Sequence, residues 1–90
     1  MLEKKEFANG NKVYKLIENK LTCYFKSGKV KAKGIYENDM MHGKWIFYRE
    51  TGQLWQVGHF LNSKKNGSWV RYDKIDKIEY NEVFKNNKKV

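Results

Sequence analysis

The amino-acid sequence repeats itself with a period of 24 residues. A tyrosine recurs at this spacing as Tyr24, Tyr48 and Tyr72, and many positions after it keep their chemical type from copy to copy. Self-similarity at such a period indicates stacked copies of one small supersecondary unit. The other repeating positions are Gly28/Gly52, Val30/Leu54/Ile78, Gly34/Gly58, Tyr36/Phe60/Phe84, Asn38/Asn62/Asn86, Gly43/Gly67 and Trp45/Trp69, with Leu21 at the tryptophan position one period earlier.

Within each copy, residues alternate with a period of two, which indicates strands. Between residues 29 and 36, Ala32, Gly34 and Tyr36 fall on one face and Lys31 and Lys33 on the other. No segment shows the apolar spacing of a helix. We therefore predict an all-β fold, a single-layer antiparallel meander of about seven or eight strands, because each copy supplies two. The single domain is predicted to cover 1–90, with an N-terminal capping hairpin at about 1–23 and repeats at about 24–47, 48–71 and 72–90.

Glycine-containing and asparagine-containing segments separate the predicted strands and indicate antiparallel connections. The third copy carries Asp76 and Glu82 where the first two have glycine. Such deviation is expected of a terminal repeat that caps the array. The turns predicted to be two-residue hairpins are Asn9-Gly10, Ser27-Gly28 and Thr51-Gly52, and those predicted to be longer are 38–43 and 62–67.

Glycine in the middle of a strand weakens a sheet, so Gly34 and Gly58 require a structural reason. In each copy a tryptophan follows eleven residues later, as Trp45 and Trp69, on the strand that returns beside the glycine. We predict that each indole lies across the bare backbone of its glycine and that this contact builds the core. The predicted structural residues are Gly34, Tyr36, Gly43, Trp45, Gly58, Phe60, Gly67 and Trp69.

The segment 36–45 reads Tyr-Glu-Asn-Asp-Met-Met-His-Gly-Lys-Trp. It resembles the aromatic-x-Asn-Gly-x-x-His-Gly-x-Trp segment of the MORN repeat, in the bacterial variant associated with antitoxin and immunity proteins. Residues 48–54 resemble the hairpin turn of that repeat, residues 60–69 form a second match, and residues 84–90 begin a third. The resemblance covers about residues 19–90 and implies a meander of β-hairpins.

The chain departs from the MORN pattern at its turns. The motif glycine is replaced by Asp39, Ser63 and Asn87, and the motif histidine of the second copy is Asn66. These residue types also suit turns, so the same fold is still implied. MORN-type repeats mainly provide interaction surfaces, with lipid binding proposed for some members and immunity against toxins for others. The resemblance therefore implies a binding protein, and fold analogy alone does not choose its partner.

Residues for catalysis or metal binding are scarce. The chain has one cysteine, Cys23, and two histidines, His42 in a predicted turn and His59 in a predicted strand. Neither histidine is placed to activate the thiol on a simple sheet register, and no helix is predicted that would present a pair of metal ligands. No glycine loop precedes a helix, as phosphate-binding loops require. We predict a protein that is not an enzyme and holds no cofactor or metal.

Charge and composition limit the class of protein. Nineteen Lys and Arg against ten Asp and Glu give a net charge of +9, spread evenly along the chain, and 16% of the residues are aromatic. That aromatic content is typical of a folded sheet rather than a disordered basic tail. The N-terminus lacks an apolar core of signal-peptide length, and no apolar stretch is long enough to span a membrane. Together with the single cysteine, these features predict a cytoplasmic location.

An uncovered single-layer sheet leaves aromatic side chains and strand edges open, which predicts protein binding. The open edges are expected near residues 4–17 and 76–85, where a second copy of the chain is also a possible partner. An antitoxin or immunity role, in which this protein would mask a toxin by covering its surface, is one of the roles that the resemblance implies. The candidate partner-binding residues are Tyr48, Trp55, Tyr72, Tyr80 and Phe84.

Two other partners are alternatives to a protein. An anionic membrane lipid or a single-stranded nucleic acid would both suit a basic face that carries aromatic rings. The face expected to present these rings carries Tyr48 and Trp55 together with Lys31 and Lys33. Because the repeat itself requires the tyrosines, stacking between copies explains them more simply, and protein binding remains the leading prediction.

Overall fold

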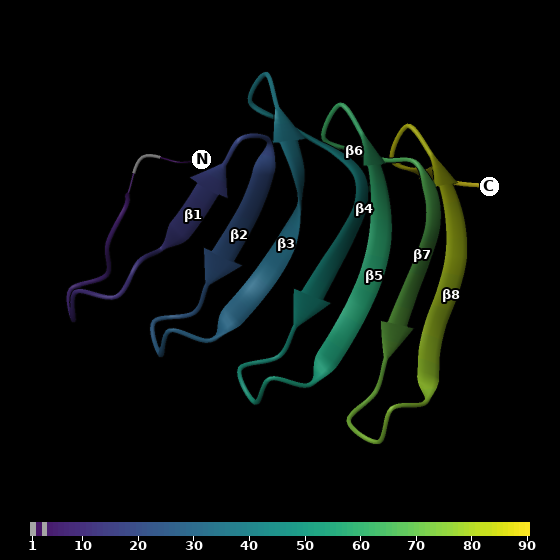
Figure 1. Ribbon diagram of the computed structural model, residues 1–90. Coiled ribbons are helices and arrows are strands. Elements are labelled where there is room, and N and C mark those ends of the chain that lie inside the picture. Colours follow the sequence, from purple (N-terminus) through teal and green to yellow (C-terminus); the bar gives the residue numbers. More distant parts are fainter. Residues whose placement is uncertain (1, 3) are drawn as a thin grey trace.

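The computed structural model describes residue 2 and residues 4–90, and it confirms the all-β prediction. The strands form one antiparallel sheet in meander order, a single curved layer that measures 41 × 35 × 17 Å (Figure 1). A very short strand, β6, pairs with β5 ahead of β7. The strands are β1 (Tyr14–Ile17), β2 (Lys20–Tyr24), β3 (Val30–Glu37), β4 (Met40–Tyr48), β5 (Leu54–Leu61), β6 (Lys64–Lys65), β7 (Gly67–Tyr72), β8 (Ile78–Lys85) and β9 (Lys88–Lys89).

The lengths of the two kinds of turn are the reverse of those predicted. Only the pair Asn38–Asp39 joins β3 to β4, and only Asn62–Ser63 joins β5 to β6. All four of these residues have positive φ, between 50° and 65°, as the tightest hairpin turns require. The glycine turns are longer and occupy residues 25–29 and 49–53. Asparagine tolerates the left-handed conformation, so the tight turns form where the sequence has asparagine.

Residues that replace the motif glycine also link neighbouring copies. The N–H of Ser63 donates to the carbonyl of Met41 at 2.9 Å, and its Oγ accepts from the N–H of Met41 at 2.9 Å. Asn87, one period later, makes the equivalent pair of bonds with Lys65, at 2.9 and 2.7 Å. Glycine at either position would lack the side-chain bond, so these departures from the repeat pattern contribute to the sheet.

The two glycine–tryptophan contacts form as predicted. Trp45 lies against Gly34 and Trp69 against Gly58, so closely that a methyl carbon added at either glycine would overlap the indole ring. The indoles are 1% and 3% exposed, respectively. Trp45 Nε1 donates to the carbonyl of Ile35 at 3.0 Å, which satisfies the polar group that burial removes from water.

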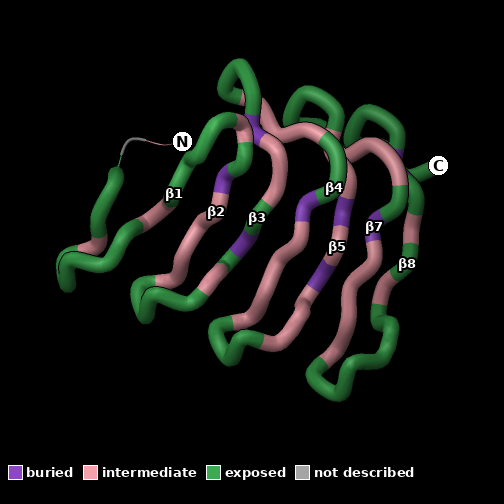
Figure 2. Tube along the Cα trace, viewed as in Figure 1, coloured by how far each residue is buried: buried purple, intermediate pink, exposed green. Residues whose placement is uncertain are grey.

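Ring-to-ring contacts continue this packing from copy to copy. Phe60 meets Trp69 edge to face at 5.2 Å and Trp45 at 6.4 Å, while Phe47 lies 6.0 Å and Phe84 lies 6.3 Å from Trp69. We call the side of the sheet defined by these five rings the aromatic face. The buried positions run across the middle of the strands (Figure 2). The core of this single layer thus consists of large aromatic rings packed against the backbone of the same sheet.

The pattern changes at both ends of the sheet. Leu21, in β2, takes the place of a tryptophan against Gly34 and is fully buried. In β8, Glu82 stands where the other copies have glycine; it pairs with Trp69, and its carboxylate lies 3.8 Å from the ammonium of Lys89. Toward one end of the array leucine thus replaces the tryptophan, and toward the other a charged residue replaces the glycine.

Candidate functional site

The face opposite the aromatic face is not covered by any other described part of the chain. Its central row is Lys33, Ile46, Val57 and Val70, which pair directly across four strands. We call this surface, together with Ile35, the lysine–aliphatic face. The four aliphatic side chains are only half-buried, whereas the buried side chains lie on the aromatic face. Half-buried aliphatic residues on an open sheet are typical of a docking surface.

A hollow of about 270 Å³ lies on this face over β2, β3 and β4. Its lining combines the apolar side chains of Ile35 and Ile46 with the lysines Lys20, Lys33 and Lys44, and none of its lining residues is acidic. An apolar surface surrounded by positive charge complements a partner whose own contact surface is apolar and acidic.

The structure does not bring the five predicted partner-binding residues together. Tyr48 and Tyr72 lie on the lysine–aliphatic face, since each follows a row residue by two positions, and Lys33 Nζ lies 5.7 Å from the Tyr48 ring. Trp55 and Tyr80 lie at the turn end of the aromatic face. Phe84 is 9% exposed and packs in the core, so this residue is structural, as Tyr36 and Phe60 are.

The face predicted for Trp55 is wrong because the register shifts beside it. Phe47 pairs with Gln56 but Tyr48 pairs with Leu54, which leaves Trp55 as an extra residue, a β-bulge. The bulge turns the indole to the same side as Gln56, where its ring lies 5.4 Å from the guanidinium of Arg71. Period-two alternation cannot reveal such a shift.

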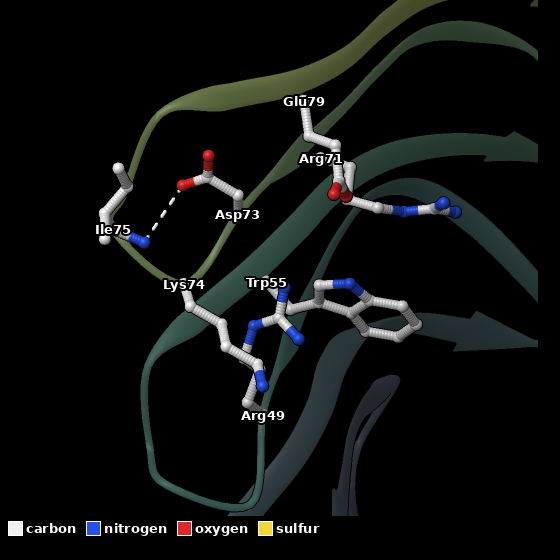
Figure 3. Close-up of a pocket in the computed structure, with 7 residues that line it drawn as sticks. All are labelled: Arg49, Trp55, Arg71, Asp73, Lys74, Ile75 and Glu79. Atoms are coloured by element: carbon white, nitrogen blue, oxygen red, sulfur yellow. Dashed lines mark hydrogen bonds between the residues drawn. The ribbon is translucent and has the colours of Figure 1, made fainter.

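A ladder of alternating cationic and aromatic groups crosses the aromatic face at its turn end (Figure 3). The guanidinium of Arg49 lies 5.9 Å from the ring of Trp55, and that of Arg71 lies 5.4 Å from Trp55 and 5.3 Å from Tyr80. We call Arg49, Trp55, Arg71 and Tyr80 the arginine ladder. Stacking on aromatic faces orients both guanidinium planes while their edges stay available for hydrogen bonds.

Three members of the ladder, Arg49, Trp55 and Arg71, line a groove of about 530 Å³. Arg71 Nε donates to Gln56 Oε1 at 3.0 Å, and Arg49 Nη2 donates to the carbonyl of Tyr72 at 3.0 Å. Gln56 is itself buried and also accepts from Trp69 Nε1 at 3.2 Å. One hydrogen bond from each guanidinium therefore fixes its position against the core.

Arg49 and Arg71 are not among the site residues that the sequence predicts. Two arginines among nineteen basic residues have little effect on the total positive charge. A usable signal was present, because Arg and Lys differ in hydrogen-bond geometry and the chain has only these two arginines. Both also occupy positions where the repeat changes residue type.

The residues considered for chemistry lie apart. Burial raises the pKa of the Cys23 thiol, and the positive charge of Lys31 opposes this increase. His59 Nδ1 lies 3.0 Å from the carbonyl oxygen of Ser68, and His42 pairs with Ile35 in the sheet. A half-buried thiol with a raised pKa is a poor nucleophile near neutral pH.

Among residue 2 and residues 4–90, no three His, Cys, Asp or Glu side chains come close enough to bind a metal ion. The same part of the chain contains no helix that is long and apolar enough to cross a membrane.

The chain was compared with protein-family models, curated proteins and solved structures. No protein-family model matches the chain, and no curated protein and no solved structure is significantly similar to it.

Proposed function

We propose that this chain is a non-catalytic protein-binding module that docks an acidic partner protein on its lysine–aliphatic face. The observation that supports the proposal is the open row of Ile46, Val57 and Val70 beside Lys33. Each of these aliphatic side chains is half-buried in the free protein, and a partner would remove the rest of its surface from water. The repeat core does not use them, because it lies on the other face.

Charge favours an acidic partner. The chain carries a net charge of +9, and three lysines line the hollow without an acidic neighbour in its lining. Positive charge around an apolar centre speeds association with a negative surface and selects against basic partners. The resemblance to MORN-variant repeats extends the proposal to an antitoxin or immunity role, in which binding occludes the surface of a toxin.

Replacing apolar residues of the docking face with glutamate tests the proposal. Tagged parent protein and the variant Ile46→Glu would be used to capture partners from cells that express the natural gene neighbourhood, and the affinity of the captured protein would be measured in about 200 mM salt. Ile17→Glu is the matched control, since Ile17 is an exposed residue of β1, 55% accessible and distant from the row. Binding of an acidic protein to the parent and to Ile17→Glu, with loss in Ile46→Glu, is the expected result.

The same experiment separates the alternative partners. Anionic lipid vesicles and a single-stranded oligonucleotide would be titrated alongside the captured protein. Nucleic-acid affinity falls steeply between about 50 and 200 mM salt, because binding releases counterions from the phosphates. Tight binding of vesicles or oligonucleotide that Ile46→Glu leaves unchanged, with no protein partner, would contradict the proposal.

A further inference from the structure

The arginine ladder occupies positions that the repeat does not determine. At its structural positions the repeat keeps tyrosine or another aromatic ring in all three copies and glycine in the first two, but at the ladder the copies differ in charge and size. A residue needed only for stacking between copies would keep its type, so the ladder needs another explanation. The matching positions are Phe25/Arg49/Asp73, Lys31/Trp55/Glu79, Ala32/Gln56/Tyr80 and Cys23/Phe47/Arg71.

Both guanidinium groups have unused donors. Arg71 donates through Nε to Gln56, and no described residue accepts from its two terminal nitrogens. Arg49 donates through Nη2 to the carbonyl of Tyr72, and its buried Nε has no acceptor in the described chain. Neither arginine forms an ion pair with a described carboxylate. Two cations held against the single ring of Trp55 thus lack a counterion among the described residues.

The carboxylates that line the groove do not pair with the two arginines. Asp73 Oδ1 accepts from the N–H groups of Ile75 and Lys77 at 2.9 and 3.0 Å, so it stabilises its own turn (Figure 3). Glu79 is exposed and forms no ion pair with the described residues. With Lys74, three cationic and two acidic side chains line the groove, which leaves it one net positive charge. That balance suits a monoanion better than a doubly charged phosphate.

We infer that the groove beside Trp55 is a binding site for a carboxylate group, recognised by the terminal nitrogens of Arg71 with Arg49 as the second cation. The planar guanidinium fork matches a carboxylate in two parallel hydrogen bonds, which a lysine cannot provide. The ligand is either a small free carboxylate or an acidic side chain of a peptide. The site lies on the face opposite the docking row, so a test of carboxylate binding is independent of a test of the proposed function.

Titration of the parent protein followed by NMR tests the site directly. The probes are acetate, a short acetylated and amidated peptide with one glutamate, and the same peptide with glutamine. We expect the glutamate peptide or acetate to shift the indole N–H of Trp55 and the Nε–H of Arg71 in a saturable way, while the glutamine peptide does not. Tighter binding of the peptide would identify an acidic side chain as the ligand, and equal binding would identify a free carboxylate.

Matched variants separate the fork from general positive charge. Arg71→Lys keeps the charge and removes the fork, and we expect it to weaken carboxylate binding about tenfold. Lys33→Gln removes a charge on the other face and should change the affinity less than about twofold. The inference is overturned if the two variants have equal effects, if none of the carboxylates moves the Trp55 signal, or if inorganic phosphate moves it at lower concentration than the glutamate peptide.

Discussion

The two faces of this sheet come from the same strands and yet differ in how far their side chains are buried. On the aromatic face Trp45 and Trp69 lie on glycine backbone and are almost completely buried. On the lysine–aliphatic face, the residues that pair across the same strands, such as Ile46 and Val57, stay half-buried. The difference shows that one face supplies the core of a single layer, while the side chains of the other face remain half-exposed.

Loss of an indole should have the largest effect on stability. Trp45→Ala and Trp69→Ala are each expected to lower the free energy of unfolding by about 3–5 kcal/mol, because each removes a buried aromatic side chain and leaves a cavity over glycine. Chemical denaturation monitored by circular dichroism measures this change. If both variants unfold at the same denaturant concentration as the parent, the aromatic face does not hold the sheet together.

Adding a methyl group under an indole should have the next largest effect. Gly34→Ala is expected to destabilise by about 2–3 kcal/mol, because the ring of Trp45 is rigid and occupies the space of the new methyl group. In the Trp45→Ala background the same change should have a much smaller effect. A double-mutant cycle on unfolding free energies measures this coupling, and additive effects would show that the ring and the glycine do not interact.

Truncation on the other face should have a small effect on stability. Ile46→Ala and Val57→Ala are each expected to lower the unfolding free energy by no more than about 1 kcal/mol, since both side chains remain half-exposed before the change. Denaturation of these variants beside Trp45→Ala compares the two faces directly. Losses as large as those of the tryptophan variants would mean that the lysine–aliphatic face is also part of the core.

The reactivity of a thiol on each face should give the smallest of these differences. Burial raises the pKa of Cys23, so its alkylation by neutral iodoacetamide should be slower than that of Thr22→Cys, placed on the opposite face in a Cys23→Ala background. Because the unfolded thiol ionises at lower pH than the folded one, the parent should lose stability relative to Cys23→Ala as pH rises through the ordinary thiol pKa. Equal alkylation rates would show that the two faces are equally accessible.

The sequence predicts the core better than the connections. Side-chain alternation, with Trp45 eleven residues after Gly34, was sufficient to predict the strands and the ring-on-glycine contact. The predicted turn lengths are wrong for two reasons. Gly28 and Gly52 lie near the end of longer bends and not in two-residue turns, and Asn38 adopts positive φ without glycine. Backbone conformation depends on which turn position a residue occupies, and composition does not specify that position.

The candidate site was the least predictable feature. The bulge at Trp55 changes the face on which its side chain lies. A bulge cannot be recognised from a period-two pattern of residues. Phe84 was assigned to the surface, although its repeat position matches the buried Tyr36. Arg49 and Arg71 both lie against the ring of Trp55 because of the register between neighbouring strands. Predicting this arrangement requires the pairing of the strands as well as their positions in the sequence.

The glycine–tryptophan contacts also give the sheet a direction. Each indole leans toward the glycine that precedes it in the chain, Trp45 on Gly34 and Trp69 on Gly58. The backbone on which each indole rests therefore lies on its N-terminal side, whereas Phe60 and Phe84 pack against Trp45 and Trp69 from the C-terminal side. Loss of β3 would remove the glycine backbone under Trp45, whereas loss of β8 would leave the backbone under both indoles and remove only the ring of Phe84 from beside Trp69. The two ends of the array are therefore not equivalent, because one supplies backbone to a ring and the other supplies a ring to a ring.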